Sequence, residues 1–391
     1  MKSEMKREFE MNLTRLSEED SALVKKARDF AQAQVAPCIE QWESEKAVPV
    51  DLLREGIDMF GGLLVPRSLG GQEANVRMTA AVLAELARAD LAFAFSLVVH
   101  LNLTGAIARI GSEGHKEKYL NKMMRGDLVG SFCLTEPEAG TDAASLHTRA
   151  RKQPNGGWDL NGAKAWTTNA VVADLFCVYA QVGEATGSRA IGSFLVERGD
   201  AGLEVEPAYQ LMGGHVMGTS GLRLNGCSLP ADRAFAPAGE GFAAAMQGID
   251  LARVVLSGMC CAILEESLTA AIQYAANRQA FSKSTLDFQG VQFPLADVQT
   301  SLRASQSLTD QAINLLDQGN DARVEAAHAK KMSTRSAFNG IAAAMQAMGA
   351  RGFRRDCALP RHLACAKMAE YLDGTTEVQN IVIGRSLSKR S

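Results

Sequence analysis

The period of the hydrophobic pattern changes twice along the chain, and this change limits the folds that the chain can adopt. Over residues 1–125, apolar residues recur at helical spacing. Over residues 126–237, turn dipeptides separate short runs rich in β-forming residues, such as Leu175–Val182 and Ser193–Glu197. Helical spacing returns over residues 238–391. The sequence therefore predicts a mostly α-helical protein with an N-terminal helical domain, a middle antiparallel β domain and a C-terminal domain of four helices.

Start and stop signals indicate the individual elements. Ser17-x-x-Asp20 has the form of a capping box, and Pro37 should end or interrupt the helix that follows it. Ala92–Ile110 is nearly all apolar, which predicts a helix buried on all sides. The other predicted helices are Met78–Ala89, Phe242–Arg278, Phe293–Leu316, Ala322–Met348 and Leu363–Leu372. The predicted turns of the β domain are Asn155-Gly156, Asn161-Gly162 and Asn225-Gly226.

Charge and composition exclude several classes of function. The net charge is −3 with no basic tract, so we expect no nucleic-acid partner. The chain lacks an unbroken run of about 18 apolar residues and begins with the charged segment MKSEMKREFE. We therefore expect neither a membrane span nor a secretory signal, and a cytoplasmic location. The eight cysteines and six histidines show no C-x-x-C or H-E-x-x-H spacing, so we expect reduced, mostly buried thiols and no metal site.

The standard nucleotide-binding loops G-x-G-x-x-G and G-x-x-x-x-G-K-[ST] are absent, as is the nucleophile motif G-x-S-x-G. Any cofactor must therefore be held in another way. Because ligands often bind where domains meet, the boundaries of the β domain are the first place to look.

Two stretches of the β domain carry groups that suit a ligand. Cys133–Ser145 reads C-L-T-E-P-E-A-G-T-D-A-A-S, and Thr135, Thr141 and the backbone near Gly140 could donate hydrogen bonds to a polar ring edge or an anion. The same residues also suit a turn rich in side-chain caps, and the two interpretations stay open. Lys164–Asn169 reads K-A-W-T-T-N and places Trp166 beside two hydroxyl groups, either in the core or as the wall of a cofactor site.

A third stretch, Glu370–Arg385, reads E-Y-L-D-G-T-T-E-V-Q-N-I-V-I-G-R. Asp373-Gly374 is a turn signal, and a turn alone would explain it. The position of this turn, between a helical run and an apolar strip, raises the alternative that it presents a carboxylate to a ligand.

Several motifs in order along the chain, from about Leu16 to the C-terminus, resemble the acyl-CoA dehydrogenase family. Cys133–Ser145 resembles the family's first signature, and Gln346–Cys365 resembles its second. The residues of the second signature that agree are Gln346, Gly349, Gly352, Phe353, Asp356 and Arg361. The positions that depart from the family pattern are His215, Ala350, Ala364, Cys365 and Asp373.

The resemblance implies the family's fold, with a β-barrel-like middle domain and a C-terminal four-helix bundle, and a bound FAD. Thr135, Trp166 and Thr168 would line the isoalloxazine ring, with Thr141 close to both the ring and the substrate. The residues that would hold the adenosine diphosphate part, typically that of a neighbouring subunit, are Arg278, Phe281, Gln289, Gln346 and Gly349. Thr375 and Glu377 would complete the cofactor site. A shared cofactor implies a homodimer or homotetramer.

The resemblance also implies α,β-desaturation of an acyl thioester, bound to CoA or to a carrier protein. Asp373 would take the α-proton, and flavin N5 would accept the hydride. The substrate would contact Thr141, Asp250, Arg253, Asp373 and Gly374. Most of the family has Glu where Asp373 stands; the branches that place the base on another helix do so at the position of Ala252, which cannot act as a base. Aspartate is shorter by one methylene, which moves the carboxylate by about 1 Å.

Three activities remain open at this stage. The first is a dehydrogenase that passes electrons to an electron-transferring flavoprotein or to oxygen. The second is a divergent member that catalyses another flavin reaction (oxidase, monooxygenase or elimination) on an unusual thioester in a biosynthetic pathway, which the departures at His215, Ala350 and Ala364-Cys365 favour. The third is a non-catalytic flavoprotein, in which Asp373 is only a turn residue.

Overall fold

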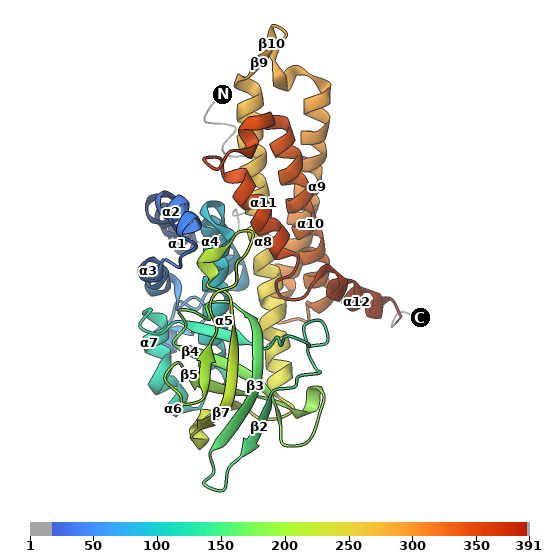
Figure 1. The fold of residues 1–391 in the computed structure, drawn as a ribbon. Coiled ribbons are helices and arrows are strands. Elements are labelled where there is room, and N and C mark those ends of the chain that lie inside the picture. The colour runs from blue at the N-terminus through green and yellow to red at the C-terminus, as the bar shows by residue number, and fades with distance from the viewer. Residues whose placement is uncertain (1–17, 389–391) are drawn as a thin grey trace.

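A computed structural model describes residues 18–388, which form two helical parts with a β domain attached between them in the chain (Figure 1). Ser17, the first residue of the predicted capping box, lies outside the described residues. The helices of the first part are α1 (Glu18–Phe30), α2 (Ile39–Glu45), α3 (Val50–Phe60), α4 (Val76–Ala89), α5 (Leu91–Ile110), α6 (Glu113–His115) and α7 (Asn121–Met124).

Pro37 interrupts a regular helix without reversing the chain. Helix α1 ends at Phe30, and a π-helical turn (Ala31–Val35) and a 3-10 turn (Ala36–Cys38) carry the chain into α2. Pro37 lies at the start of the 3-10 turn, where its missing N–H is not needed.

Side-chain caps begin α4 and α5. Asn75 Oδ1 accepts a hydrogen bond from Met78 N at 2.8 Å, and Asp90 Oδ1 accepts one from Phe93 N at 2.9 Å. Such caps satisfy N–H groups that have no partner within the helix. The junction between the two helices is thereby fixed by polar groups inside an apolar core.

Helix α5 and the later helix α8 (Gly241–Asn277) are long and apolar enough to cross a bilayer by length and composition. Neither helix contains an unbroken run of 18 apolar residues, so length and mean composition alone bring them to this threshold. However, 89% and 78% of the relevant windows are buried inside the protein, as in the core helices of many folded domains. Burial of α5 on all sides explains why its sequence shows no polar face.

The β domain is a single eight-stranded sheet with the order β6-β7-β3-β2-β4-β5-β8, and β1 also pairs with β4. Its strands are β1 (Gly130–Cys133), β2 (Arg149–Lys152), β3 (Trp158–Thr167), β4 (Leu175–Val182), β5 (Ile191–Glu197), β6 (Leu203–Val205), β7 (Ser220–Leu229) and β8 (Ala234–Ala236). Strands β1 and β2 pair with β4 in parallel, whereas the other pairs are antiparallel. The sheet is therefore mixed rather than purely antiparallel.

Two of the three predicted turns are instead irregularities within paired strands. Asn161-Gly162 lies inside β3 and Asn225-Gly226 lies inside β7, where the register shifts between the two strands. The side-chain oxygen of Asn161 accepts a hydrogen bond from Gly226 N at 2.8 Å, which joins the two irregular segments. Residues that favour turns also favour bulges, so the dipeptides alone could not separate the two outcomes.

The C-terminal part consists of α8, a β9–β10 hairpin (Gln279–Ala280 and Lys283–Ser284), α9 (Gln289–Asp317), α10 (Arg323–Met348), α11 (Ala358–Ala369) and α12 (Thr376–Leu387). Helix α12 projects from the body of the molecule, and the hairpin forms the tip of the bundle (Figure 1). The sequence pattern did not predict α12, although Thr375 caps it. Its apolar residues do not form a helical stripe, so no periodic pattern marks it. Gln379 is its one fully buried residue.

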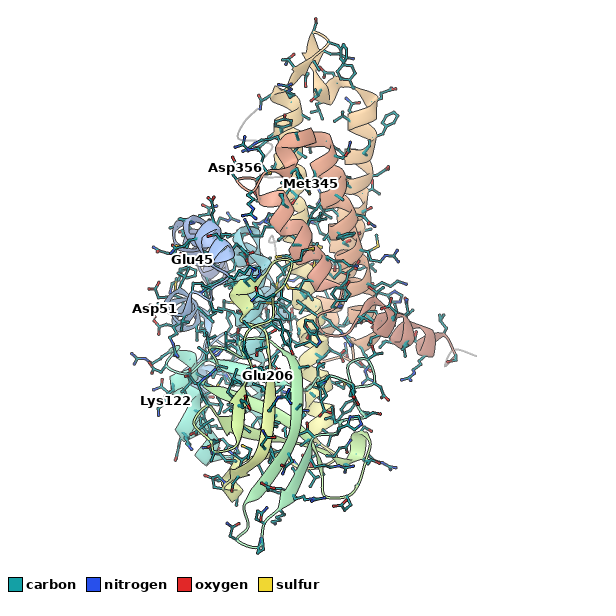
Figure 2. All side chains as sticks on the ribbon, viewed as in Figure 1. Glu45, Asp51, Lys122, Glu206, Met345 and Asp356 are labelled. Atoms are coloured by element: carbon teal, nitrogen blue, oxygen red, sulfur yellow. The ribbon has the colours of Figure 1, made fainter. Side chains whose placement is uncertain are left out.

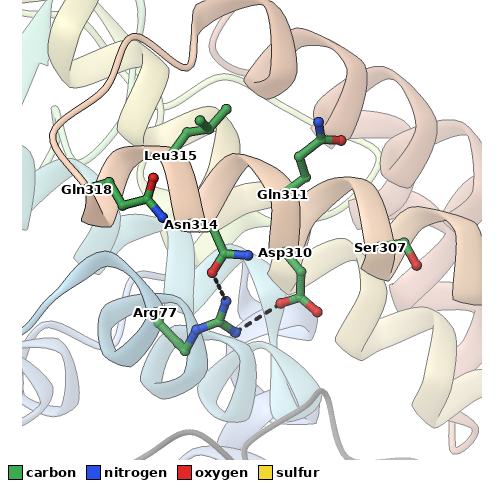
Figure 3. A pocket seen from close by; sticks show the side chains of 7 residues that line it. All are labelled: Arg77, Ser307, Asp310, Gln311, Asn314, Leu315 and Gln318. Carbon is green, nitrogen blue, oxygen red and sulfur yellow. Dashed lines mark hydrogen bonds and ion pairs between the residues drawn. The ribbon is translucent and has the colours of Figure 1, made fainter.

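The two helical parts share one hydrophobic core, which includes residues of α1–α5 and of α8–α11. A polar contact at its edge joins α4 to α9: Arg77 forms an ion pair with Asp310 at 3.0 Å and donates a hydrogen bond to Asn314 at 3.0 Å (Figure 3). Six cysteines lie in the protein interior, Cys357 is half-buried, and Cys38 is exposed; all eight are free thiols.

Candidate active site

A buried ion pair fixes the segment that carries Thr135 and Thr141 onto strand β3. Lys164 Nζ lies 2.7 Å from Glu136 Oε1 and donates a hydrogen bond to Leu134 O at 3.1 Å. The Glu136 carboxylate also accepts hydrogen bonds from the backbone N–H groups of His147 and Thr148. Burial opposes the charged form of Glu136, but Lys164 and these hydrogen bonds outweigh it and lower the pKa of the carboxyl.

The two predicted threonines of this segment differ in exposure. Thr135 is half-buried, and its carbonyl accepts a hydrogen bond from Ala165 N at 2.9 Å, next to Trp166. Thr141 is exposed, and the space around the neighbouring Gly140 is open. The structure therefore brings Thr135 to the C-terminal end of β3, where the K-A-W-T-T-N segment begins, and leaves Thr141 exposed to a bound molecule.

Trp166 is not a core residue. Its side chain is 62% exposed, and its ring meets the Tyr209 ring edge to face at a centroid distance of 4.8 Å. Trp166 and Asn169 both have left-handed backbone conformations, with φ of 56° and 65°. The side chain of Asn169 donates hydrogen bonds to Ser96 O at 2.9 Å and Gly130 O at 3.2 Å, which fixes the turn against α5 and β1. This turn thus presents a flat aromatic surface to solvent.

Thr168 is the first residue after β3, two positions beyond Trp166, and is buried. Its carbonyl accepts a hydrogen bond from Ser131 Oγ at 2.6 Å, so the backbone of the turn is tied to β1 on this side as well. The turn and the Thr135 segment together offer hydroxyl groups and an aromatic face, which suits a flat polar ring system.

Asp373 lies in a loop of unusual conformation between α11 and α12. Asp373 has φ of 51° and the following Gly374 has φ of 94°, so two consecutive residues are left-handed. Glycine is needed at the second position because a side chain there would meet Arg253, Val378 and Gln379 at 3.1–3.2 Å as well as being strained. Thr375 then caps α12 by accepting a hydrogen bond from Val378 N.

The Asp373 side chain is half-buried, and its carboxyl has no hydrogen-bond or ion-pair partner among residues 18–388. Its Oδ2 atom is buried without a hydrogen-bond partner. Burial raises the pKa of this carboxyl to about 6, and the charges of Lys330 and Arg253 limit the increase. The backbone N–H of Asp373 also donates to no group among residues 18–388. The loop therefore has a possible proton acceptor and a hydrogen-bond donor that are both available to a bound molecule.

Arg253 of α8 connects this loop to Asp250. Its Nε donates a hydrogen bond to Asp373 O at 2.9 Å, and its Nη1 donates one to Asp250 Oδ1 at 2.9 Å. Ala252, the alternative position for a base, is buried beside them. The structure thus brings together four of the five predicted substrate residues, namely Asp250, Arg253, Asp373 and Gly374.

The residues predicted to hold the adenosine diphosphate part lie at the other end of the C-terminal helices. Arg278 follows α8 and Phe281 is in the hairpin at the tip, whereas Arg253 lies 25 residues earlier in α8. At 1.5 Å per residue, Arg253 and Arg278 are about 37 Å apart along the helix. Figure 2 shows Met345 and Asp356, which flank Gly349 in sequence, well away from Glu206 on the β domain. One chain therefore does not assemble both groups into one site.

These distant residues are exposed. Arg278 forms no ion pair within residues 18–388, Phe281 is 92% exposed, and Gln289 and Gln346 also face solvent. Gly349 has φ of 58°, and no heavy atom lies within 4 Å of the position its Cβ would take. A free guanidinium group, exposed amides and an open backbone form a donor set that suits phosphate and polar ring edges.

Two departures from the family pattern lie together, away from the Asp373 loop contacts described above. A 3-10 turn (His215–Met217) packs against α5 and α2. Gly213, just before this turn, runs close to α11, since a Cβ there would lie 3.0 Å from Ala364. His215 Nδ1 lies 3.2 Å from Glu43 Oε2, so this histidine interacts with α2. The small Ala364 leaves room for the turn, which gives the change a packing reason.

Sequence patterns did not indicate Lys330, Gln379 or Tyr209 as site residues. Lys330 and Gln379 contact the Asp373 loop, and Tyr209 contacts Trp166. Lys330 and Tyr209 make their contacts with residues far away in the chain, and Gln379 lies on α12, which was not predicted. No local motif could therefore have identified them.

The chain matches three family models: "Acyl-CoA dehydrogenase, N-terminal domain" over residues 17–127, "middle domain" over 131–227 and "C-terminal domain" over 239–388. It is similar to an acyl-CoA dehydrogenase of Bacillus subtilis (strain 168), with 31% identity over 95% of this chain and 98% of the relative. Its fold is similar to butyryl-CoA dehydrogenase from Megasphaera elsdenii (TM-score 0.91, 30% identity, covering 95% of this chain and 98% of that one). It is also similar to the prolyl acyl carrier protein oxidase AnaB (TM-score 0.90, 26% identity, covering 95% and 99%). The predicted fold class is confirmed.

Replacing Lys164 with methionine should destabilise the protein strongly, because the Glu136 carboxylate would stay buried without its cation. Breaking such a pair typically costs about 3–5 kcal/mol of unfolding free energy. The control is Lys25→Met, which breaks the exposed Lys25–Asp29 pair and should cost no more than about 1 kcal/mol. Urea unfolding measures the loss of unfolding free energy in each variant. Equal losses would contradict the prediction, whereas recovery in Lys164→Met/Glu136→Gln would support it.

Asp373→Asn should stabilise the protein at pH 8 but not at pH 4. The pKa of Asp373 rises from about 3.9 in the unfolded chain to about 6 in the folded protein, so folding favours the protonated form. The native protein should therefore lose stability as the pH rises from about 4 to about 6, by up to about 3 kcal/mol. Urea unfolding of both proteins at the two pH values tests this. A difference that does not change with pH would show that the carboxyl is not desolvated.

Proposed function

The chain belongs to the acyl-CoA dehydrogenase family, and we propose that it desaturates an acyl thioester between its α and β carbons with Asp373 as the base. It is an oxidoreductase, and its cofactor is FAD. The observation that carries the proposal is the buried, unpartnered carboxylate oxygen of Asp373 on a loop held by Arg253 and Lys330.

The residues present fit this cofactor. The exposed face of Trp166 and the hydroxyl groups of Thr135 and Thr168 suit the isoalloxazine ring, with Thr141 near the ring and the thioester. Thr375 and Glu377, at the start of α12, would complete this end of the site. When bound, FAD accepts the hydride that leaves the β-carbon.

Asp373 has the properties that proton abstraction needs. With a pKa of about 6, its carboxylate is ionised at neutral pH, yet it binds a proton more strongly than an exposed aspartate does. Because Oδ2 has no hydrogen-bond partner, it is free to accept a proton. These two features favour a working base over a simple turn residue.

The α-proton of a thioester is a weak acid unless the developing charge on the carbonyl oxygen is stabilised. The free N–H of Asp373 can donate to this oxygen, and loss of such a donor typically costs about 3 kcal/mol of transition-state stabilisation. Arg253 fixes the peptide through Asp373 O, and Asp250 holds the guanidinium in turn. The same residue would thus contribute the base and the oxyanion donor.

The separation of the two groups of residues supports a cofactor shared between subunits. Arg278 and its partners Phe281, Gln289, Gln346 and Gly349 would bind the adenosine diphosphate part of an FAD whose ring lies in a neighbouring subunit. The distance of about 37 Å along α8 supports this arrangement. We therefore propose a homodimer or homotetramer.

A second candidate is an oxidase or another flavin reaction that acts on an acyl group attached to a carrier protein. It is favoured by the similarity to the prolyl acyl carrier protein oxidase AnaB and by aspartate at the position of the base. In the first candidate the electron acceptor is an electron-transferring flavoprotein, and in the second it is oxygen. For both we propose a cytoplasmic location.

Asp373→Asn should keep FAD but lose turnover. The asparagine is nearly the same size and retains the backbone N–H, so only the proton acceptor is removed. Purified protein is mixed anaerobically with a panel of thioesters that includes butyryl-CoA and prolyl and butyryl carrier-protein forms, and loss of the flavin absorbance is followed. We expect the native protein to bleach with at least one thioester and the variant to bleach at least about 100-fold more slowly. Equal rates would place the base elsewhere, and a native protein without FAD would end the proposal.

Mixed oligomers test the shared site. Arg278→Ala and Asp373→Asn, each inactive or poor in FAD alone, are co-expressed with different tags, and the mixed species is purified. A shared site combines Asp373 of one chain with Arg278 of the other, so roughly half of the sites should be intact. Bleaching activity should reappear in the mixed species. If each chain builds its own site, the mixed oligomer stays as inactive as its parents.

A further inference from the structure

The ammonium group of Lys330 lies beneath the Asp373 loop. Lys330 belongs to α10 and is 1% exposed. Its Nζ donates hydrogen bonds to Gly374 O at 2.6 Å and to Glu370 O at 3.3 Å. A buried lysine is costly unless its charge is used, and here its hydrogen bonds go to backbone carbonyls of the loop.

Two other side chains hold the same loop by its carbonyls. Arg253 donates to Asp373 O at 2.9 Å, and Gln379 donates to Gly374 O at 2.8 Å. Because Asp373 and Gly374 are both left-handed, the loop needs such anchors to keep its conformation. The two cations, Lys330 and Arg253, are thereby bonded to the backbone and form no ion pair with the Asp373 carboxylate within 4.0 Å.

We propose that Lys330 is a positioning residue for the base: it fixes the loop through Gly374 O and Glu370 O and places a buried ammonium group under the loop without pairing with the Asp373 carboxylate. This inference rests on the proposed function of Asp373. A direct ion pair would neutralise the carboxylate and block its access to substrate. An ammonium held at the backbone supplies the field and leaves Oδ2 free.

The charged and titratable groups that face Lys330 are Asp373 in the loop, Glu370 just after α11, Glu377 on α12, and Cys260 and Arg253 on α8. Burial lowers the pKa of Lys330 to about 8, with Arg253 acting in the same direction and Asp373, Cys260 and Glu370 opposing it. Lys330 is thus mostly charged over the pH range in which Asp373 ionises. The proton equilibrium of Asp373 therefore depends on this lysine.

The test compares Lys330→Gln, Lys330→Met and Lys330→Arg with Lys331→Gln, which removes the same charge from the adjacent residue of α10. FAD content is measured first for each holoenzyme. The pH profile of flavin bleaching follows, with the panel thioester that bleaches the native protein fastest. Lys330→Gln keeps an N–H donor but lacks the charge, so its acid limb should move up by about one pH unit or more. One unit below the native limb, its rate should then be roughly tenfold lower.

Lys330→Met loses the charge and the donor, so its maximal rate should also fall, by about 10–100-fold. Lys330→Arg should keep the native acid limb, because the charge remains, and Lys331→Gln should match the native enzyme. An unchanged acid limb in both Lys330→Gln and Lys330→Met would overturn the proposal. Should Lys330→Met lose FAD, Lys330→Gln and Lys330→Arg decide.

A second measurement needs no substrate. The difference in unfolding free energy between Lys330→Gln and the double variant Lys330→Gln/Asp373→Asn, followed with pH, gives the pKa of the carboxyl directly. The pH above which this difference stops changing marks the pKa of Asp373 in the folded protein. It should be higher than in the same comparison of the native protein with Asp373→Asn; an equal value would overturn the proposal. Failure of the proposed function gives a different result, since Asp373→Asn would then retain turnover. An inactive Asp373→Asn with unchanged Lys330 variants overturns only the role of Lys330.

Discussion

Helix α8 is the element on which the rest of the structure depends. It packs against α4 and α5 on one side and against α9, α10 and α11 on the other, and it is buried along most of its length. Because it is one continuous helix, its length separates Arg253 from Arg278 and cannot be shortened by local adjustment. The same helix that holds the Asp373 loop through Arg253 therefore also carries Arg278 at its far end. If Arg278 binds the cofactor of a neighbouring subunit, as proposed, one helix connects subunit assembly with the chemistry at Asp373.

Two opposing effects, rather than a single strong ion pair, set the pKa of the Asp373 carboxyl. Desolvation favours the protonated carboxyl, while two nearby cations favour the carboxylate. Neither effect alone would suit a proton acceptor. Desolvation alone would favour the protonated carboxyl, and a cation in direct contact would bind the carboxylate in an ion pair. Holding the cations at backbone carbonyls lets the two effects act together and leaves the carboxylate unpaired.

Much of the fold could be predicted from the sequence, because hydrophobic period and element length are local properties. Strand β4 has the bounds predicted for Leu175–Val182, and α4 and α5 agree within two residues. The bulges at Asn161-Gly162 and Asn225-Gly226 could not be told from turns, since both outcomes use the same residues. Within the candidate site, motif positions such as Trp166 could be named in advance. Lys330 reaches the Asp373 loop only through contacts with Gly374 and Glu370, which are 44 and 40 residues away in the chain. Contacts of that kind are set by packing and have no signature in sequence.

The distribution of thiols has a practical consequence for spectroscopy on this protein. Burial raises the pKa of Cys133, Cys177 and Cys260 to about 12, so these groups carry almost no thiolate at neutral pH and are shielded from reagents. Cys38, between α1 and α2, is exposed. A maleimide dye added to the native protein should therefore attach mainly at Cys38, with the half-buried Cys357 reacting more slowly. One mild labelling step then yields a fluorescent marker on the N-terminal helices, without engineering away the other cysteines.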